Sequence, residues 1–314
     1  MNYKTVLKGV SVLFLSTVIS QVINFLMLPY ISREYSEDSL AVMGVMASAL
    51  VILTIFSTFR LEFYIVKKEK SEYLEFAQSL YLFALISSLI LSPILLIYFH
   101  YKDITVTYTV IIFSLFYLLA SFYLNISTSV MTQRKEFVIQ AAIKISRSII
   151  LITSLWLFNS LEIIGVFASL SLSVILPLII YINYRKDDFS GLFSKVLSKV
   201  HIVIGQLKNN HHAATQAIFN VLNLQFISFY VIFFESNFLI ASYFFMERLI
   251  NSPLNLLASS VRQVLYKDFV VHKNKVNILL KRMLVYQFIL LGIATAVFFA
   301  FLFFGEELIH YLLG

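Results

Sequence analysis

The stretch Ile163–Ile182, with the sequence IIGVFASLSLSVILPLIIYI, decides the fold class of this chain. It runs for twenty residues without a charged side chain, and the nearest charges are Glu162 and Arg185. A helix needs roughly 20 mostly apolar residues to cross the hydrocarbon core of a bilayer. Lipid offers the backbone no hydrogen-bond partner, so such a segment must be helical. We therefore predict a membrane-spanning helix over this stretch.

Eight further stretches have the same length and apolar character. They are Gly9–Ile31, Leu40–Phe59, Phe76–Phe99, Ile104–Leu124, Phe137–Phe158, His212–Phe234, Phe238–Ser259 and Met283–Phe304. The first is too long for the core of a signal peptide, so we expect it to be retained as a span. Apolar residues make up 60% of the chain and charged residues 13%, whereas soluble domains carry roughly 25% charge. The sequence predicts an all-α, polytopic integral membrane protein of about nine to ten transmembrane helices.

Several function classes lack their motifs in this chain. Cysteine is absent, which excludes a disulfide scaffold and a cysteine-type zinc site. No G-x-x-x-x-G-K-[ST] phosphate loop occurs, so we do not expect ATP hydrolysis. His211 and His212 are adjacent rather than one helical turn apart, which disfavours metal binding. We expect no metal and no cofactor.

The basic residues predict the orientation. Of the 24 Lys and Arg residues, 21 fall on the side of the membrane that holds the N-terminus, and only Arg33 and Lys102 fall on the other, with Arg248 inside a span. Cytoplasmic loops carry the excess of Lys and Arg in membrane proteins. We therefore predict a cytoplasmic N-terminus, and we attribute the net charge of +7 to topology rather than to nucleic-acid binding.

The longest polar connection, Tyr184–Asn210, predicts a division into two lobes. We expect an N-terminal six-helix lobe over 1–184, a cytoplasmic connecting segment over 185–210 and an incomplete C-terminal transmembrane lobe over 211–314. The first and seventh spans share a polar pattern 199 residues apart, formed by Thr17, Gln21 and Asn24 and by Gln216, Asn220 and Asn223. Each trio lies on one helical face, which is consistent with parallel repeats.

These amides allow two interpretations. Asn and Gln side chains in spans commonly form hydrogen bonds with neighbouring helices, for about 0.6–2 kcal/mol. Alternatively, Gln21 and Asn24 in one lobe and Asn220 and Asn223 in the other line a wet cavity between the lobes.

The charged residues of the predicted spans also allow two interpretations. A charge at the middle of a span costs about 2.5–3.5 kcal/mol on the insertion scale, so it should pair or face water. Glu247 and Arg248 therefore form either interhelical salt bridges or part of a cavity. Arg60 and Arg147 serve either as anchors near the membrane surface or as ligands for phosphate, to which guanidinium groups form bidentate hydrogen bonds.

Three segments carry a resemblance to a known family. They are Ser20–Arg33, with SQVINF and LPYISR; Arg60–Val66, RLEFYIV; and Ala241–Leu249, ASYFFMERL, followed by Pro253 and by Ser260–Tyr266, SVRQVLY. Their order resembles the first, second and eighth helices of the polysaccharide and O-unit flippases in the multidrug/oligosaccharidyl-lipid/polysaccharide exporter superfamily. The resemblance covers essentially the whole chain.

This resemblance implies a flippase of the inner membrane rather than an enzyme. Its expected cargo is a polyprenyl-diphosphate-linked oligosaccharide, carried to the outer leaflet for O-antigen or another surface polysaccharide. Expected partners are this lipid-linked oligosaccharide, membrane lipids and other polysaccharide-assembly membrane proteins, and no nucleic acid. We assign diphosphate or acidic-sugar binding to Arg60, Arg147, Arg248 and Arg262; sugar hydrogen bonding to Gln21, Asn24, Asn220, Asn223 and Asn251; and ion coupling to Glu247 or Glu62.

Three other interpretations remain open. Such flippases resemble a twelve-helix protein, whereas this sequence stops at Gly314 within an expected tenth helix, so an inactive truncated flippase is one alternative. A multidrug/cation antiporter of the same superfamily would need buried acids in its cavity. A membrane polysaccharide polymerase would need an acidic catalytic pair, and none stands out in the short outer loops.

Overall fold

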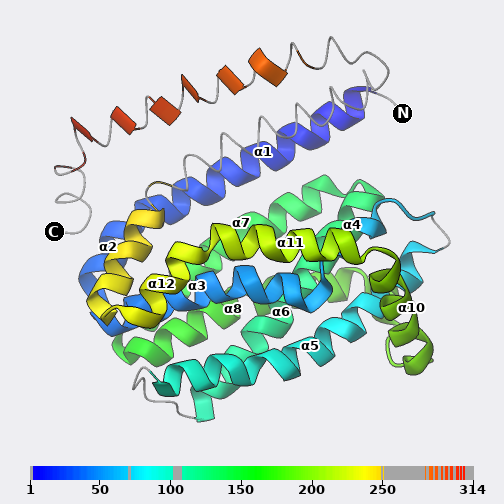
Figure 1. The fold of residues 1–314 in the computed structure, drawn as a ribbon, viewed down its shortest axis with the longest axis horizontal. Helices are drawn as coiled ribbons and strands as arrows, with labels where there is room; N and C mark the ends of the chain where they lie inside the picture. Colours follow the sequence, from blue (N-terminus) through cyan, green and yellow to red (C-terminus); the bar gives the residue numbers. More distant parts are fainter. Residues whose placement is uncertain are drawn as a thin grey trace. The chain divides into compact units, whose positions relative to one another are not determined.

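A computed structural model describes residues 3–69, 72–101, 108–248 and 250, with scattered residues between 280 and 307. The regular structure of the described residues is helical, and they contain no strand (Figure 1). The helices are α1 Tyr3–Leu26, α2 Leu28–Glu34, α3 Glu37–Thr58, α4 Glu62–Ile65, α5 Tyr73–Tyr101, α6 Tyr108–Arg134, α7 Phe137–Leu157, η1 Asn159–Leu161, α8 Glu162–Tyr184, α9 Lys186–Phe189, α10 Val196–Asn209, α11 His211–Leu224 and α12 Phe226–Phe234. Contacts divide the chain into unit 1, Met1–Glu34 with Phe244–Gly314, and unit 2, Tyr35–Tyr243.

The long helices have the length and composition of membrane spans. Six candidates lie among the described residues: Ser11–Glu34, Glu37–Thr58, Tyr73–Leu95, Tyr108–Arg134, Phe137–Leu157 and Asn159–Tyr184. A bent pair, Ala214–Leu224 with Phe226–Phe234, is a seventh. The prediction of an all-α, polytopic membrane protein is confirmed, and these segments match the first seven predicted spans. The predicted spans Phe238–Ser259 and Met283–Phe304 extend outside the described residues. The lobe division at 185–210 stays a prediction.

The first predicted span consists of two helices separated by one residue. The chain leaves α1 at Leu26, and α2 begins at Leu28. Pro29 lies in the first turn of α2, where a helix needs no hydrogen bond from the backbone N–H group. In one uninterrupted helix the residue at this position would donate such a bond, and proline has no N–H group to donate. Both helices lie within one span candidate, Ser11–Glu34, so the predicted span over Gly9–Ile31 is confirmed.

The fourth predicted span ends earlier in the sequence than the helix does. The helix α6 begins at Tyr108 and ends at Arg134, ten residues beyond the predicted Leu124. Its added polar residues are held inside the bundle: the Ser127 hydroxyl lies 2.8 Å from the Tyr81 hydroxyl of α5. Hydrogen bonds to neighbouring helices therefore extend the helix beyond its apolar run.

The seventh predicted span bends by 55° at Gln225, between α11 and α12. No proline or glycine lies near this bend. The Gln225 backbone N–H donates to the Val221 carbonyl over 2.8 Å, and the side-chain Oε1 atom is buried without a hydrogen-bond partner. The sequence carried no helix-breaking signal for this feature.

A polar cap starts the helix α3. Ser36 is the N-cap of α3, and its hydroxyl accepts a hydrogen bond from the Ser39 backbone N–H. Glu37 and Asp38 occupy the first turn, where carboxylates favour the positive end of the helix dipole. The same helix ends at Thr58, and its C-cap residue Phe59 adopts a left-handed φ of 50°.

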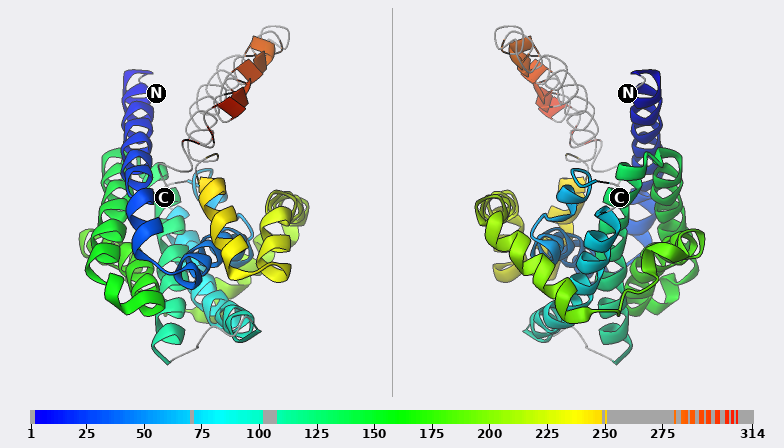
Figure 2. Two further views of the ribbon diagram at one scale, coloured as in Figure 1. Left: turned by 90° about the vertical axis from the view of Figure 1, so that its left-hand side faces the viewer. Right: turned by 90° about the vertical axis from the view of Figure 1, so that its right-hand side faces the viewer.

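The helices α3, α5, α6 and α8 pack against one another within unit 2, and α7 packs on α8 (Figures 1 and 2). Serine hydroxyls join these spans: Ser171 of α8 donates to the Phe113 carbonyl of α6 over 2.8 Å. Gly165 lets α8 approach the end of α7, because a Cβ atom there would lie 2.1 Å from the Phe158 carbonyl oxygen. Small side chains thus permit close helix packing.

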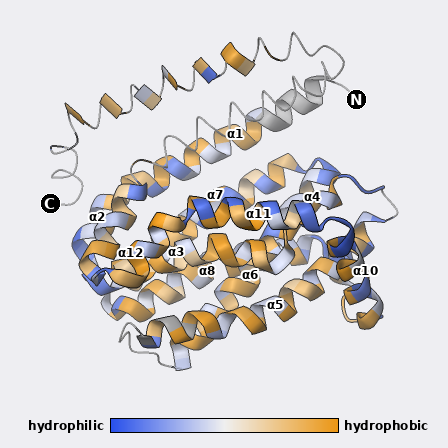
Figure 3. Cartoon of the chain, viewed as in Figure 1, coloured by the Kyte–Doolittle hydropathy of each residue, from blue (hydrophilic) through white to orange (hydrophobic). Residues whose placement is uncertain are grey.

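The connecting segment is anchored to one end of unit 2. Figure 3 shows hydrophilic residues gathered at this end, around α4 and α10. Asp188 of α9 pairs with Arg134 of α6, and α10 packs on α5. The Lys199 ammonium of α10 donates to the Gly191 and Leu192 carbonyls. Burial lowers the pKa of Lys199, and the carboxylate of Glu75 on α5 opposes that shift.

Candidate functional site

The helix α7 carries a polar face inside a membrane span. Gln140, Lys144 and Arg147 recur at i, i+4 and i+7, which places them on one side of the helix. The exposed apolar side chains Val138 and Trp156 lie about 160° around the helix from Gln140, at 100° per residue. The polar face therefore points away from the side of α7 that is suited to lipid contact.

Arg147 is the central cation of this face. It lies ten residues after Phe137, about 15 Å along the helix at 1.5 Å per residue, near the middle of a bilayer core of about 30 Å. Tyr117 of α6 and a second basic residue, Lys144, lie close to its guanidinium. The salt bridges among the described residues are Lys68–Glu72, Arg134–Asp188 and Arg185–Glu136, so Arg147 has no carboxylate partner there.

Gln140 adds an acceptor to the same face. Its Oε1 atom is buried and accepts no hydrogen bond from the described residues. Burying an amide oxygen without a hydrogen-bond donor lowers the folding stability by about 1–3 kcal/mol, unless water or a ligand donates a hydrogen bond to it. The polar face of α7, defined by Gln140, Lys144 and Arg147, thus offers two positive charges and one open acceptor.

Glu62 occupies a different environment. It is 3% exposed at the start of α4, and both of its carboxylate oxygens accept hydrogen bonds. The Thr58 hydroxyl of α3 donates to Oε2, and the Asn125 amide of α6 donates to Oε1 over 3.2 Å. The structure thus brings Glu62 together with two polar residues that the sequence analysis did not select, and these hydrogen bonds tie α3 and α4 to α6.

Arg60 lies in the turn that joins α3 to α4. Its φ is 62°, in the left-handed region, directly after the left-handed Phe59. The guanidinium carbon is 5.5 Å from the centre of the Phe63 ring, within cation–π range. Arg60 is half-buried and fixed by this turn.

Arg248 and Glu247 belong to unit 1, on the helical residues 237–248. Both are half-buried, and the Arg248 guanidinium carbon is 4.6 Å from the centre of the Phe244 ring. The predicted site residues Asn251 and Arg262 lie outside the described residues.

The four amides selected from the repeat pattern fall into both units. Gln21 and Asn24 are half-buried on α1, in unit 1, while Asn220 and Asn223 are exposed on α11, in unit 2. Their assignment to one cavity stays a prediction.

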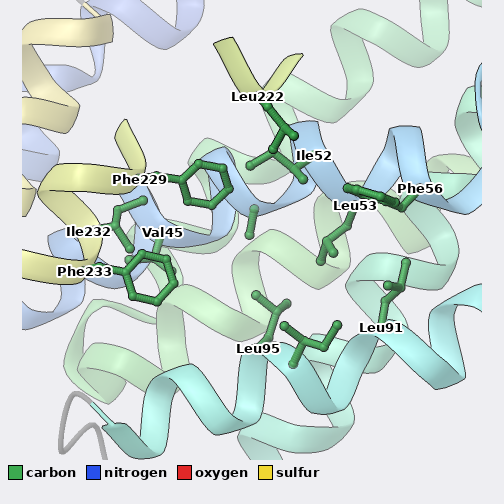
Figure 4. A pocket seen from close by; sticks show the side chains of 12 residues that line it. Val45, Ile52, Leu53, Phe56, Leu91, Leu95, Leu222, Phe229, Ile232 and Phe233 are labelled. Carbon is green, nitrogen blue, oxygen red and sulfur yellow. The ribbon is translucent and has the colours of Figure 1, made fainter. Parts of the chain in front are cut away.

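An apolar pocket of about 320 Å³ lies within unit 2, and the sequence analysis did not predict it (Figure 4). Its walls come from α3, α5, α11 and α12, on both sides of the bend at Gln225. All of its lining side chains are apolar: Val45, Ala49, Ile52, Leu53, Phe56, Leu91, Ile94, Leu95, Leu222, Phe229, Ile232 and Phe233. A pocket without a donor or acceptor suits hydrocarbon and disfavours sugar or phosphate. The bend that helps to shape it carried no sequence signal, which is why the pocket was missed.

Comparison with known proteins adds one finding. Residues 6–266 match the model of a family described as "Polysaccharide biosynthesis protein". The curated proteins and the solved structures gave no match. The matched range contains all seven described span candidates, the polar face of α7 and the Glu62 cluster.

Proposed function

The chain belongs to the polysaccharide biosynthesis protein family, and on that basis we propose that it is a flippase for a lipid-linked oligosaccharide. Its cargo would be a polyprenyl-diphosphate-linked oligosaccharide that crosses from the cytoplasmic to the outer leaflet of the inner membrane. The N-terminus would face the cytoplasm. The product would serve O-antigen or another surface polysaccharide, and other membrane proteins of that assembly would be its partners.

The observation that carries this proposal is the environment of Arg147. A cation near the middle of a span, with no carboxylate partner among the described residues, requires an anion or water for its solvation. A diphosphate offers several oxygens to a guanidinium, in the bidentate geometry that arginine favours. Lys144 on the same face increases the attraction for a doubly charged headgroup. In this proposal, Arg147 binds the diphosphate while the sugar passes.

The apolar pocket suits the other end of the cargo. Polyprenyl tails are hydrocarbon, and the pocket walls offer only aliphatic and aromatic carbon. Its volume of about 320 Å³ lies at the lower end of the ligand-pocket range of 300–1,000 Å³, so it would hold a segment of the tail rather than all of it. The tail would stay in an apolar environment while the charged headgroup follows the polar face of α7.

The environment of Glu62 disfavours the cation antiporter. The two oxygens of Glu62 accept hydrogen bonds from Thr58 and Asn125, which leaves fewer lone pairs for a cation. In our proposal Glu62 holds α3, α4 and α6 together. It binds a proton or a sodium ion only if its hydrogen bonds with Thr58 and Asn125 break. We also propose that the chain transports without covalent chemistry, so that it is not an enzyme.

The test is complementation of a strain that lacks its own O-unit flippase, with surface sugar as the readout. The chain should restore surface sugar, Arg147→Ala should lower it at least about tenfold through loss of a charged hydrogen bond, and Arg147→Lys should retain part of it. Lys186→Ala removes an exposed cation of α9 and serves as the matched control. Equal surface sugar from Arg147→Ala and the unmodified chain, at equal membrane levels, would contradict the proposal.

A further inference from the structure

The connecting segment presents an apolar surface that no described residue covers. Phe193 is 68% exposed, Leu197 is 86% exposed and Ile204 is 51% exposed. At 100° per residue, Val196, Leu197 and Ile204 fall within an arc of about 100° on α10. We name this arc, with Phe193, the apolar strip of α10.

A second side of α10, about 100–160° around the helix from Leu197 and Ile204, is fixed to unit 2, so the helix cannot turn these two residues inward. Lys199 and Val203 are buried, and α10 packs on α5. The Lys199 ammonium binds the carbonyls of Gly191 and Leu192, just before the helix. The Gln78 amide of α5 donates to the Ser190 carbonyl over 2.8 Å. These bonds hold the start of the segment and set the rotation of α10.

Positive charge accompanies the strip. Lys195 precedes α10, and Lys208 lies beside Leu197 on the helix; both lysines are exposed. No Asp or Glu occurs between Phe189 and Phe234. A helix with an apolar strip bordered by cations matches the pattern of helices that lie in the headgroup layer of anionic membranes.

The position of α10 agrees with that pattern. It lies at the end of unit 2 where the span α5 begins (Figure 1). This is also the end at which Arg134 closes the span α6. A helix packed against the end of a membrane span reaches the boundary between headgroups and hydrocarbon.

We propose that the apolar strip of α10 inserts into the headgroup layer of the bilayer and that Lys195 and Lys208 bind anionic lipid headgroups. The strip enters the layer to the depth of its side chains, and the cations remain at the level of the phosphates. This anchors the connecting segment to the membrane, and it does not depend on the transported cargo.

The absence of cysteine gives a direct test, since each introduced cysteine is then the sole labelling site. Nitroxide labels at Leu197→Cys and Ile204→Cys report the strip, and Ser198→Cys, an exposed position about 100° further around the helix, is the matched control. The full chain is reconstituted in bilayers of phosphatidylethanolamine and phosphatidylglycerol. Collision with oxygen reports lipid, and collision with a water-soluble nickel complex reports water.

Labels on the strip should collide with oxygen and not with nickel, while the Ser198→Cys label should collide mainly with nickel. Nickel collision at Leu197→Cys and Ile204→Cys would overturn the proposal in favour of an aqueous surface. Protection from both reagents would overturn it in favour of a protein contact. Two strip positions are used so that a local disturbance of α10 by one substitution is recognised, and unfolding curves verify that both variants fold.

A second measurement tests the charges. Replacing phosphatidylglycerol by phosphatidylcholine should shift the strip labels toward nickel collision, because the anionic headgroups are lost. Lys195→Asn with Lys208→Gln should abolish this lipid dependence; Asn suits position 195, where φ is 50°. A lipid dependence that persists in the double variant would refute the assigned role of these two lysines.

Discussion

Arg134, the last residue of α6, binds Asp188 of α9 through two hydrogen bonds, 2.9 Å from Nη1 to Oδ2 and 2.5 Å from Nη2 to Oδ1. Asp188 is 1% exposed, and it also accepts a hydrogen bond from the Tyr181 hydroxyl over 3.0 Å. The Arg134 Nε–H donates to the Tyr73 hydroxyl over 2.8 Å. One ion pair therefore joins α5, α6, α8 and α9 at the end of the bundle where the connecting segment begins.

Asp188→Ala should lower the free energy of unfolding by about 3 kcal/mol, because it leaves the half-buried Arg134 guanidinium without its carboxylate. Thermal unfolding in detergent measures this change. Glu72→Ala breaks the exposed Lys68–Glu72 pair and should cost no more than about 0.5 kcal/mol. Equal losses in the two variants would show that the buried pair contributes no more than a surface pair.

Two glycine substitutions should change stability in opposite directions. Gly165→Ala should destabilise by about 1–3 kcal/mol, because the added Cβ would lie 2.1 Å from the Phe158 carbonyl oxygen. Gly205→Ala on α10 should stabilise by about 1 kcal/mol, since nothing lies within 4 Å of its added Cβ and alanine favours the helix. Unfolding midpoints in the same detergent provide the comparison, and a stabilising Gly165→Ala would contradict the close approach of α8 to the end of α7.

Variants of Glu62 distinguish a supporting role from ion coupling. Glu62→Ala should lower the free energy of unfolding by about 2 kcal/mol, because the Thr58 hydroxyl and the Asn125 amide lose their acceptor. Glu62→Gln keeps an acceptor for Asn125 and should cost less than about 1 kcal/mol. Unfolding curves measure both changes. Normal folding of Glu62→Gln with loss of transport would indicate that the carboxylate charge itself is needed, which would support the predicted coupling role.

Filling the apolar pocket should impair transport without impairing folding. Ala49→Phe places a ring in the space of about 320 Å³ and should lower surface sugar in the complementation strain, because the lipid tail loses its place. Ala142→Phe adds the same ring to an exposed position of α7 and is the control. Full activity of Ala49→Phe, at normal membrane levels, would refute the assignment of the pocket to the tail.

The spans were predictable from single segments. A run such as Ile163–Ile182 must be helical in lipid because its backbone has no other hydrogen-bond partner, and this holds whatever lies next to it. The N-cap at Ser36 was predictable for the same local reason, since its partner Ser39 is three residues away. The end of α6 was not predictable from one segment. It depends on the hydrogen bond between Ser127 and Tyr81, which joins two helices.

The candidate site was predictable only in part. The position of Arg147 in the fifth span follows from the sequence. Tyr117 lies near it only because of the way α6 and α7 pack. The sequence analysis did not select Asn125, because a single amide in a span is common. Its role depends on a hydrogen bond to Glu62, which lies 63 positions earlier in the chain. The arrangement of Gln21, Asn24, Asn220 and Asn223 stays a prediction.

The sequence by itself determined that the chain crosses a membrane several times, because the cost of an unsatisfied backbone in lipid acts on each segment separately. It also located the charged residues within those spans. Tertiary structure alone decided which polar groups meet: Asp188 reaches Arg134 across 54 positions, and the pocket wall forms where α12 turns by 55° toward α3. Such pairings depend on side-chain packing between helices, which the period of one helix does not encode.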